Sequence, residues 1–507
     1  MPRFRRLSAL LLILVAGSLV EAGGSRTLVV CNDTTDPVSL DPHREFDASS
    51  DNIINQIFDG LVRLTPEGKV APALAQSWRR LDDMTVEFYL RRNVVFHNGE
   101  PFNAQAVRFS LKRQLDPLRP APNADLLNSI AGVEVVDDYT VRIKTKSKDG
   151  VLLNKLPMFV KILPPGYLAQ AGEAGFAAHP VGTGPFVFER WVRGDRIDLK
   201  ANPFYWMAGV PSFERLVFRF VPLQRQTEAL LKGELDMVTD LSGLDTLKVA
   251  SHETTKIVKA KNFYSVSFIF NSRKAPFSDS RLRKAVAMSL DARALIRYGA
   301  KGNGVTLNTL TMPGEFGHNP DIPGYPYDVR QARRLLAEAG YSGGLKIKIQ
   351  VREEIKNFAK IIVAQLAKAG IEADAYVVSQ EKQYQEIVLP NLDPSKPPWD
   401  GDIVLLHYVD PMAHVYFPYA IFLYSKGAYS LNRDREFDER FLEMTSTADL
   451  PAQEKMCRKL EELIWEKCLA FSPLQVIRPF GVNKRVRYTP HITGMLDFRY
   501  AAIEEKT

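Results

Sequence analysis

The stretch from Val70 to Pro117 constrains the fold of this 507-residue chain more than any other part of the sequence. Within it, Thr85–Leu90 alternates between apolar and polar side chains, which predicts a strand covered on one face. Asn98-Gly99 then predicts a tight turn, because this pair tolerates a positive φ. Asn103 is typical of an N-cap, and apolar residues follow it at helical spacing. The stretch therefore predicts a strand, a turn and a capped helix, and it contains no catalytic pattern.

Several pieces of this stretch share their spacing with a known family. They are Pro72–Trp78, Phe88–Gly99 and Phe102–Ser110, and further matches are Gly182–Pro185, Phe277–Asp291 and Tyr327–Tyr341. Together they resemble the extracellular family 5 solute-binding proteins of ABC importers, which include peptide- and nickel-binding receptors. Gly182–Gly184 does not predict a phosphate-binding loop, since no helix start and no Lys-Ser/Thr follow it.

The resemblance implies an α/β fold of the two-lobed periplasmic binding protein type. Two crossing segments would join the lobes, the ligand cleft would lie between them, and an extra domain would sit on the N-terminal lobe. We place the N-terminal lobe at 23–45, 179–268 and 478–507, the extra domain at 46–178 and the C-terminal lobe at 269–477. The length agrees with more than one domain.

The first 22 residues predict a secretory signal peptide. Cationic residues are followed by an apolar run, Leu7–Val20, and by small residues before a cleavage site that we place after Ala22. A membrane anchor is the weaker alternative, because the run is shorter than the roughly 20 residues that span a bilayer. We therefore expect a soluble protein exported to the periplasm. Cys31 follows bulky residues, so we expect a strand cysteine there and no lipid attachment.

Composition and motifs argue against other classes of protein. The 45% apolar and 25% charged residues are ordinary for a soluble globular chain. Basic runs such as Arg330–Arg334 fall on amphipathic helices beside acids, so we expect no nucleic-acid partner. No nucleophile elbow, zinc-protease, dinucleotide or Cys-x-x-Cys motif occurs, so we expect no enzyme and no cofactor.

The resemblance also implies the partners of the chain. A small solute, peptide-like first of all, would be presented to an ABC permease, and a separate ATPase subunit would hydrolyse ATP because this chain has no P-loop. We expect a monomer. Alternatives left open are a chelated metal such as nickel, an oligosaccharide, or a binding protein that serves a chemoreceptor or helps folding.

The stretch Trp399–Pro411 is the part most informative about the ligand. In peptide-binding members of the family, an Asp near the end of this strand pairs with the free amino group of the peptide, and His407 takes its place here. A histidine is a poor partner for an ammonium group, which puts ordinary peptide recognition in doubt. The candidate ligand-binding residues are Trp399, His407, Tyr408, Asp410, Asn271, Tyr264 and Asp36.

His407 and His414 are seven residues apart, which is the spacing of one helical face and raises a metal-site hypothesis. No third ligand at metal spacing follows from the sequence. A hydrogen-bonded pocket histidine and an ordinary surface histidine are the simpler interpretation, so we expect no metal site built by protein side chains.

Overall fold

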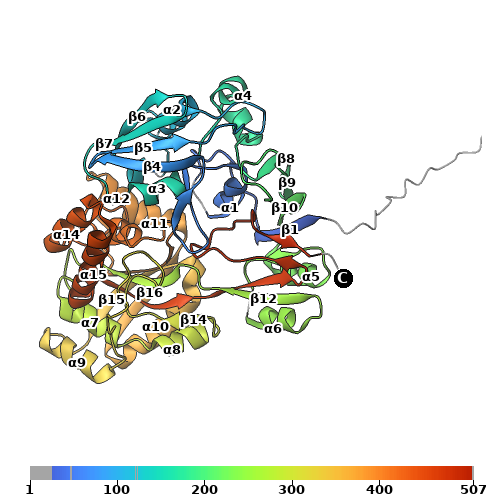
Figure 1. The fold of residues 1–507 in the computed structure, drawn as a ribbon. Helices are drawn as coiled ribbons and strands as arrows, with labels where there is room; N and C mark the ends of the chain where they lie inside the picture. The colour runs from blue at the N-terminus through green and yellow to red at the C-terminus, as the bar shows by residue number, and fades with distance from the viewer. Residues whose placement is uncertain (1–25, 46–47, 120, 123, 242, 505–507) are drawn as a thin grey trace, which may run out of the picture.

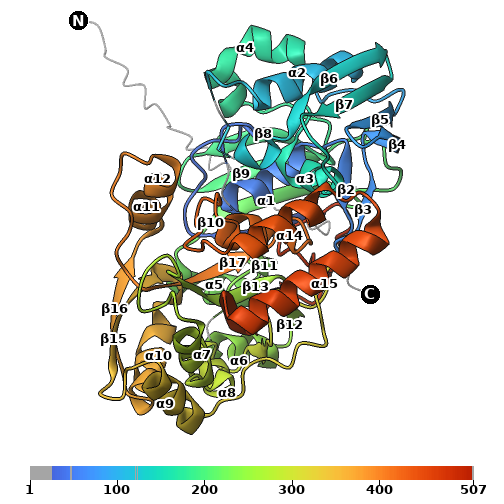
Figure 2. The same cartoon turned by 90° about the vertical axis from the view of Figure 1, so that its left-hand side faces the viewer.

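The computed structural model describes residues 26–45, 48–119, 121–122, 124–241 and 243–504. The predicted signal peptide, 1–22, lies outside these residues. Figures 1 and 2 show three bodies: the lobe of β1 and β8–β12, the lobe of β13–β18, and a smaller domain of β4–β7 above them.

A seven-stranded mixed sheet forms the N-terminal lobe. Its strands in spatial order are β12 (Thr255–Ala260), β19 (Arg478–Asn483), β11 (Met237–Val238), β1 (Thr27–Asp33), β10 (Arg215–Phe220), β9 (Arg196–Ala201) and β8 (Phe186–Val192). The central strand β1 is parallel to both of its neighbours, as expected for a strand buried on both faces. Helices α5 (Leu223–Leu231) and α6 (Gly243–Ser251) belong to this lobe.

A six-stranded mixed sheet forms the C-terminal lobe. Its order is β14 (Gly304–Thr306), β18 (Ala470–Val476), β13 (Tyr264–Phe270), β17 (Ile403–Val409), β15 (Leu345–Arg352) and β16 (Ile371–Val378). The predicted lobe boundary at 268/269 falls inside β13, all of which pairs in this sheet. The division of the chain into lobes at the predicted residues stays a prediction.

Two short segments cross between the lobes side by side. Residues 261–263 join β12 to β13, and Ile477 joins β18 to β19. On either side of the crossing the strands are antiparallel neighbours, with Ala260 opposite Arg478 in one sheet and Ser265 opposite Gln475 in the other. The crossing is therefore a pair of hydrogen-bonded chains that continues from one sheet into the next.

The smaller domain contains a four-stranded antiparallel sheet in the order β4 (Ala75–Asp82), β5 (Thr85–Leu90), β7 (Thr140–Thr145) and β6 (Ile130–Asp137). Its apolar face shares one hydrophobic cluster with helices of the C-terminal half, and the cluster contains both Phe88 and Phe437. A hydrogen bond of 2.7 Å from the Gly150 amide to the Thr445 carbonyl joins the same two parts. Figure 2 shows α14 and α15 next to this domain.

The remaining elements complete the three bodies. Two short strand pairs are β2 (Val62–Leu64) with β3 (Val70–Pro72), and β20 (Val486–Arg487) with β21 (Ala502–Ile503). The other helices are α1 (Ala48–Ile57), α2 (Ala104–Gln114), α3 (Leu152–Phe159), α4 (Pro165–Ala178), α7 (Ser280–Met288), α8 (Ala292–Ala294), α9 (Val329–Glu338), α10 (Lys356–Lys368), α11 (Gln380–Gln383), α12 (Leu389–Leu392), α13 (Tyr416–Pro418), α14 (Arg435–Ser446) and α15 (Leu450–Lys467).

Local chemistry explains where the predicted elements begin. The Asn103 side chain accepts hydrogen bonds from the backbone amides of the first turn of α2, and Asp279 and Asp328 do the same for α7 and α9. Gly99 has a φ of 86°, as the predicted turn requires. The Asn103 cap and the Asn98-Gly99 turn predicted from the sequence are confirmed.

The apolar residues at helical spacing in 51–62 predict a helix over that whole range, and this prediction is wrong at its carboxyl end. Helix α1 stops at Ile57, and Val62 already lies in β2. At Gly60 the backbone passes so close to α3 that an added Cβ would lie 2.7 Å from the Val160 carbonyl oxygen. The chain leaves the helix before this point because tertiary packing overrides the helical periodicity of the sequence.

Cys31 lies in β1, as predicted, and Cys31, Cys457 and Cys468 are buried free thiols. Within the part of the chain that the structure describes, no helix has the length and apolar character needed to cross a membrane.

The strand that anchors the smaller domain yields a stability prediction. Phe88 on β5 is fully buried, so Phe88→Ala should lower the free energy of unfolding by about 3–5 kcal/mol through lost burial and a cavity. Met84→Ala, at a residue 46% exposed in the preceding turn, is the matched control and should change it by less than about 0.5 kcal/mol. Urea unfolding measures both, and equal effects would contradict the assigned burial.

Candidate functional site

The candidate site lies where the chains cross between the lobes. Tyr264 is the first residue of β13, immediately after one crossing segment, and Arg478 is the first residue of β19, immediately after the other. Strands β15 and β17 are parallel, so their carboxyl ends, Arg352 and Val409, lie at the same edge of the sheet. In open α/β sheets, ligands bind beyond the carboxyl ends of the strands.

Two aromatic rings stack at this edge. The rings of Tyr264 and His407 have centroids 4.7 Å apart and planes inclined by 16°. In the antiparallel pair β13–β17, Tyr264 lies opposite Val409 and Val266 lies opposite His407. Side chains of a strand alternate between faces, so Tyr264 and His407 project from the same face and meet diagonally.

Charged groups from both lobes surround this stack. Burial, with smaller contributions from Asp240 and Glu354, raises the pKa of Tyr264 to about 12 against the opposing effect of the cations Arg478 and Arg352. Asp240 follows β11 of the N-terminal lobe, whereas Glu354 follows β15 of the C-terminal lobe. The guanidinium carbon of Arg478 lies 6.0 Å from the centroid of the Tyr264 ring.

His407 is held in its neutral form. Burial lowers its pKa to about 4, and the nearby cations Arg352 and Arg478 also disfavour a second positive charge, while Glu354 opposes them. Its Nδ1 atom is buried and has no hydrogen-bond partner among the described residues. At neutral pH the imidazole is thus an uncharged hydrogen-bonding group with one nitrogen free.

Arg352 supplies a second free polar atom. Its Nη2 donates to Glu354 at 2.7 Å and to Gln380 at 3.1 Å, and its Nη1 donates to Gln383 at 3.1 Å. Its Nε–H is buried without a partner in the described part of the chain. Burial raises the pKa of Glu354, but the hydrogen bond from Arg352 outweighs it and the net pKa is lowered, so the pair stays ionised.

Buried polar atoms in folded proteins almost always have partners, so the unpartnered atoms His407 Nδ1, in the stack, and Arg352 Nε, at the end of β15, need an explanation. Ligand sites combine apolar and aromatic walls with a few polar groups that fix orientation, and this edge of the sheet has that composition. The arrangement suits a solute with a flat or apolar part and hydrogen-bonding ends. It offers no nucleophile activated by a neighbouring base.

Tyr408 and Asp410 project from the opposite face of β17. The Tyr408 hydroxyl donates to the Leu310 carbonyl at 2.9 Å, and the Asp410 carboxylate accepts from the backbone amides of Met412 and His414. Asp410 is fully buried and closes the turn after the strand. Both side chains are therefore satisfied within the protein, and a role in ligand contact stays a prediction for each.

Trp399 and Asn271 lie close together, and their polar groups bond to other groups of the protein. The Asn271 amide donates to the backbone carbonyls of Trp399 and Gly401, and the Trp399 indole donates to the Tyr376 hydroxyl. Asp36 lies elsewhere in the N-terminal lobe, where its carboxylate accepts from the Trp191 indole at 3.0 Å. Ligand contacts of these candidates remain predictions.

The idea that His407 and His414 share a helical face is wrong, because His407 lies on β17 and His414 in the turn after it. The expectation of a surface histidine is wrong for His414, which is buried. Among the described residues, no group of three or more side chains is arranged to hold a metal ion.

Sequence reasoning missed Arg352, Glu354, Arg478 and Asp240. A signal for Arg352 and Glu354 was present, because they directly follow the predicted strand Leu345–Val351 and strand ends are where ligands bind. Arg478 and Asp240 carry no local signal, since only the crossing of the chains brings them to Tyr264.

Comparison with known proteins identifies the family of this chain. Residues 69–429 match the model of the bacterial extracellular solute-binding proteins, family 5. The chain belongs to this family, as its sequence motifs indicated, and members of the family are binding proteins.

Individual relatives agree. The chain is 31% identical over 390 residues to heme-binding protein A of Haemophilus influenzae, covering 70% of each, and 30% identical over 367 residues to the glutathione-binding protein GsiB of Salmonella choleraesuis, covering 71% of this chain and 69% of that one. Its fold matches the ABC transporter-associated periplasmic binding protein DppA of Helicobacter pylori, in complex with the peptide STSA, with a TM-score of 0.79. That match has 23% identity and covers 94% of this chain and 98% of the other. The predicted two-lobed fold is confirmed.

The neutral state of His407 can be tested without a ligand. In histidine-labelled protein, the NMR signals of His407, assigned with the His407→Gln variant, should report a neutral ring from pH 8 to about pH 5 and protonation near pH 4. Since this pKa lies below the ordinary value of 6.5, the site disfavours the charged form, and stability from this residue is lost as the pH falls from 6.5 towards 4. A midpoint at or above 6.5 would contradict the assigned burial.

Proposed function

We propose that this protein captures a small peptide-like solute between its two lobes, at the Tyr264–His407 stack, and delivers it to an ABC permease. Family membership supports solute binding, and the matching relatives include one named for glutathione and a structure that holds a peptide. The observation that carries the location is the stacked His407, whose buried Nδ1 atom has no hydrogen-bond partner among the described residues, at the edge of the sheet where β15 also ends in Arg352.

The chemistry of these groups indicates the kind of solute. The stacked rings offer a flat apolar surface, and the Arg352 and Arg478 guanidinium groups favour a carboxylate. Glu354 and Asp240 provide acceptors for amide or amino protons on the same solute. A small molecule with a carboxylate, amide groups and a hydrophobic or thiol-bearing part fits this set. Chelated nickel and oligosaccharides are the alternative ligands that the test distinguishes.

The proposed function requires that the chain is exported to the periplasm. We infer that residues 1–22 direct the chain to the periplasm, where it acts as a monomer with membrane permease and ATPase subunits as partners, in keeping with an extracellular solute-binding family. A chemoreceptor that recognises the solute-bound protein would be an additional partner.

The solute is identified by native mass spectrometry of the mature protein purified from the periplasm of its own host, followed by thermal-shift assays of whatever co-purifies. A ligand at 100 times its dissociation constant stabilises the protein by about 2.7 kcal/mol, so a true substrate should be obvious. A peptide-like mass supports the proposal; a metal chelate or a sugar overturns the substrate class.

Variants then test the place of binding. Tyr264→Ala and Arg352→Met should each lower the affinity for the co-purified solute at least about tenfold. The first removes a buried contact and the second a charged donor. Arg293→Met, at an exposed arginine of the same lobe, is the matched control and should leave affinity unchanged. Unchanged affinity in both site variants, measured by calorimetry, would place the ligand elsewhere.

A further inference from the structure

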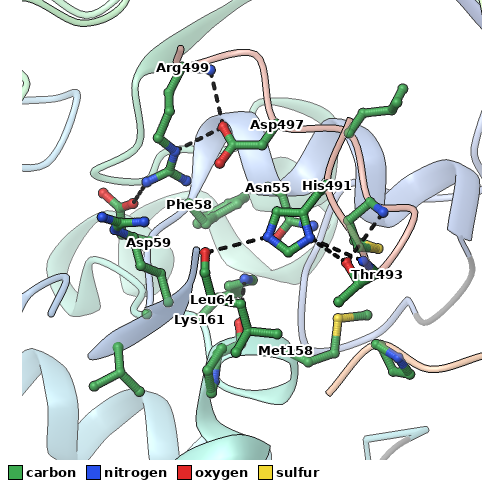
Figure 3. Close-up of a pocket in the computed structure, with 17 residues that line it drawn as sticks. Asn55, Phe58, Asp59, Leu64, Met158, Lys161, His491, Thr493, Asp497 and Arg499 are labelled. Atoms are coloured by element: carbon green, nitrogen blue, oxygen red, sulfur yellow. Dashed lines mark hydrogen bonds and ion pairs between the residues drawn. The ribbon is translucent and has the colours of Figure 1, made fainter. Parts of the chain in front are cut away.

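A cavity of mixed lining lies away from the Tyr264–His407 stack. It encloses about 70 Å³ between the end of α1, β2, the residues that end and follow α3, and the carboxyl-terminal segment 491–499. Pro411, in the turn after β17, also reaches it. Figure 3 shows Lys161, Met158, His491 and Arg499 around this space. A site here is independent of the proposed solute site, because none of the side chains of that site lines it.

The carboxylates that line this cavity, Asp59 and Asp497, already have partners. The Asp59 carboxylate accepts from the Trp206 indole at 2.9 Å and the Tyr205 hydroxyl at 3.2 Å, and it lies 3.7 Å from Arg499. Asp497 accepts from Nε of Arg499 at 2.9 Å and from its backbone amide at 3.0 Å. Figure 3 shows this chain of contacts from Asp59 through Arg499 to Asp497. A ligand that donates protons would find few free acceptors here.

His491 is similarly engaged. One ring nitrogen lies 3.5 Å from the Leu64 carbonyl, and the other lies 2.8 Å from the Thr493 hydroxyl. Burial lowers the pKa of His491, so the ring is uncharged at neutral pH. The histidine shapes the cavity and adds no charge to it.

The donors, in contrast, are not all used. The Lys161 ammonium is 9% exposed, and within the described residues its hydrogen-bond acceptor is the Pro157 carbonyl at 2.9 Å. An ammonium group has three N–H donors, so two remain. The Nε–H of Arg63 is buried and has no hydrogen-bond partner in the described structure, while its guanidinium lies 6.0 Å from the ring centroid of Tyr500.

The charge of Lys161 also favours an anion in this cavity. Burial lowers the pKa of Lys161 to about 8, and the carboxylates of Asp51, Asp59 and Asp497 offset only part of that cost, while Arg499 adds to it. The positive charge of Lys161 is therefore incompletely compensated. A negative charge placed next to it would relieve the cost of burial.

We propose that this cavity binds a small monovalent anion, of halide or formate size, between the Lys161 ammonium and the Arg63 guanidinium. The space is several times the minimum that a water molecule needs and accommodates such an ion with little rearrangement. The anion satisfies free donors contributed by β2 and by the segment after α3, and it sits against the carboxyl-terminal segment 491–499. It thereby ties β2 and the segment after α3 to the end of the chain.

Bromide is the direct probe. Crystals of the full mature protein grown in sodium bromide should show an anomalous peak beside Lys161 Nζ. In solution, sodium formate should raise the melting temperature in a saturable way relative to sodium gluconate at equal ionic strength, because gluconate is too large to enter. Water without anomalous signal in the cavity, together with equal melting temperatures in the two salts, would overturn the proposal.

Variants assign the effect to the cavity. Lys161→Met and Arg63→Gln should each raise the formate dissociation constant at least about tenfold, since each removes a donor to a charged group. Lys69→Met, at an exposed lysine of the turn before β3, should leave it unchanged. If Lys161→Met does not fold, Arg63→Gln and the bromide peak of the unaltered protein decide. Retained formate affinity in Arg63→Gln with no bromide peak would contradict the site.

Discussion

The double crossing between the two sheets is the constraint on which the rest of the structure depends. Strands β12 and β19 pair in one lobe, and their continuations β13 and β18 pair in the other. Gln475 donates to the Asn262 carbonyl at 2.8 Å within the crossing itself. Because the connecting segments are so short, relative motion of the lobes is restricted to changes in a few backbone angles, which is how hinges between domains work.

The same crossing builds the candidate site. Tyr264 and Arg478 are the residues at which the two chains enter their new sheets, so they face the junction by position alone. The C-terminal lobe adds His407, Arg352 and Glu354 from strand ends, and the N-terminal lobe adds Asp240. Opening of the lobes would separate Asp240 from His407, Arg352 and Glu354, so this set of charges comes together only when the lobes are close. If the solute binds here as proposed, its capture would favour closure for this reason.

Local signals allowed much of the fold to be predicted from the sequence. The caps Asn103, Asp279 and Asp328 and the alternation of Thr85–Leu90 act over a few residues, and each element formed where it was expected. The end of α1 was missed because the close passage of Gly60 past α3 is a tertiary constraint.

The candidate site was predictable only in part. Tyr264 and His407 lie at the ends of recognisable strands, and they are the two predicted residues that the structure stacks together. Tyr408 and Asp410 are neighbours of His407 in sequence, but the alternation of β17 turns them into the core. Arg478 is more than 60 residues from any of these side chains, and Asp240 follows β11 of the other lobe, so only the crossing brings them near.

Hydrogen–deuterium exchange of the full mature protein, with and without the co-purified solute, tests the central claim most directly. The account predicts that the solute slows exchange most in the segments 261–266, 352–357, 405–410 and 475–480, from both lobes at once. The exposed edge strand β6 of the smaller domain should not change. Protection confined to one lobe, or strongest in β6, would contradict binding at the crossing.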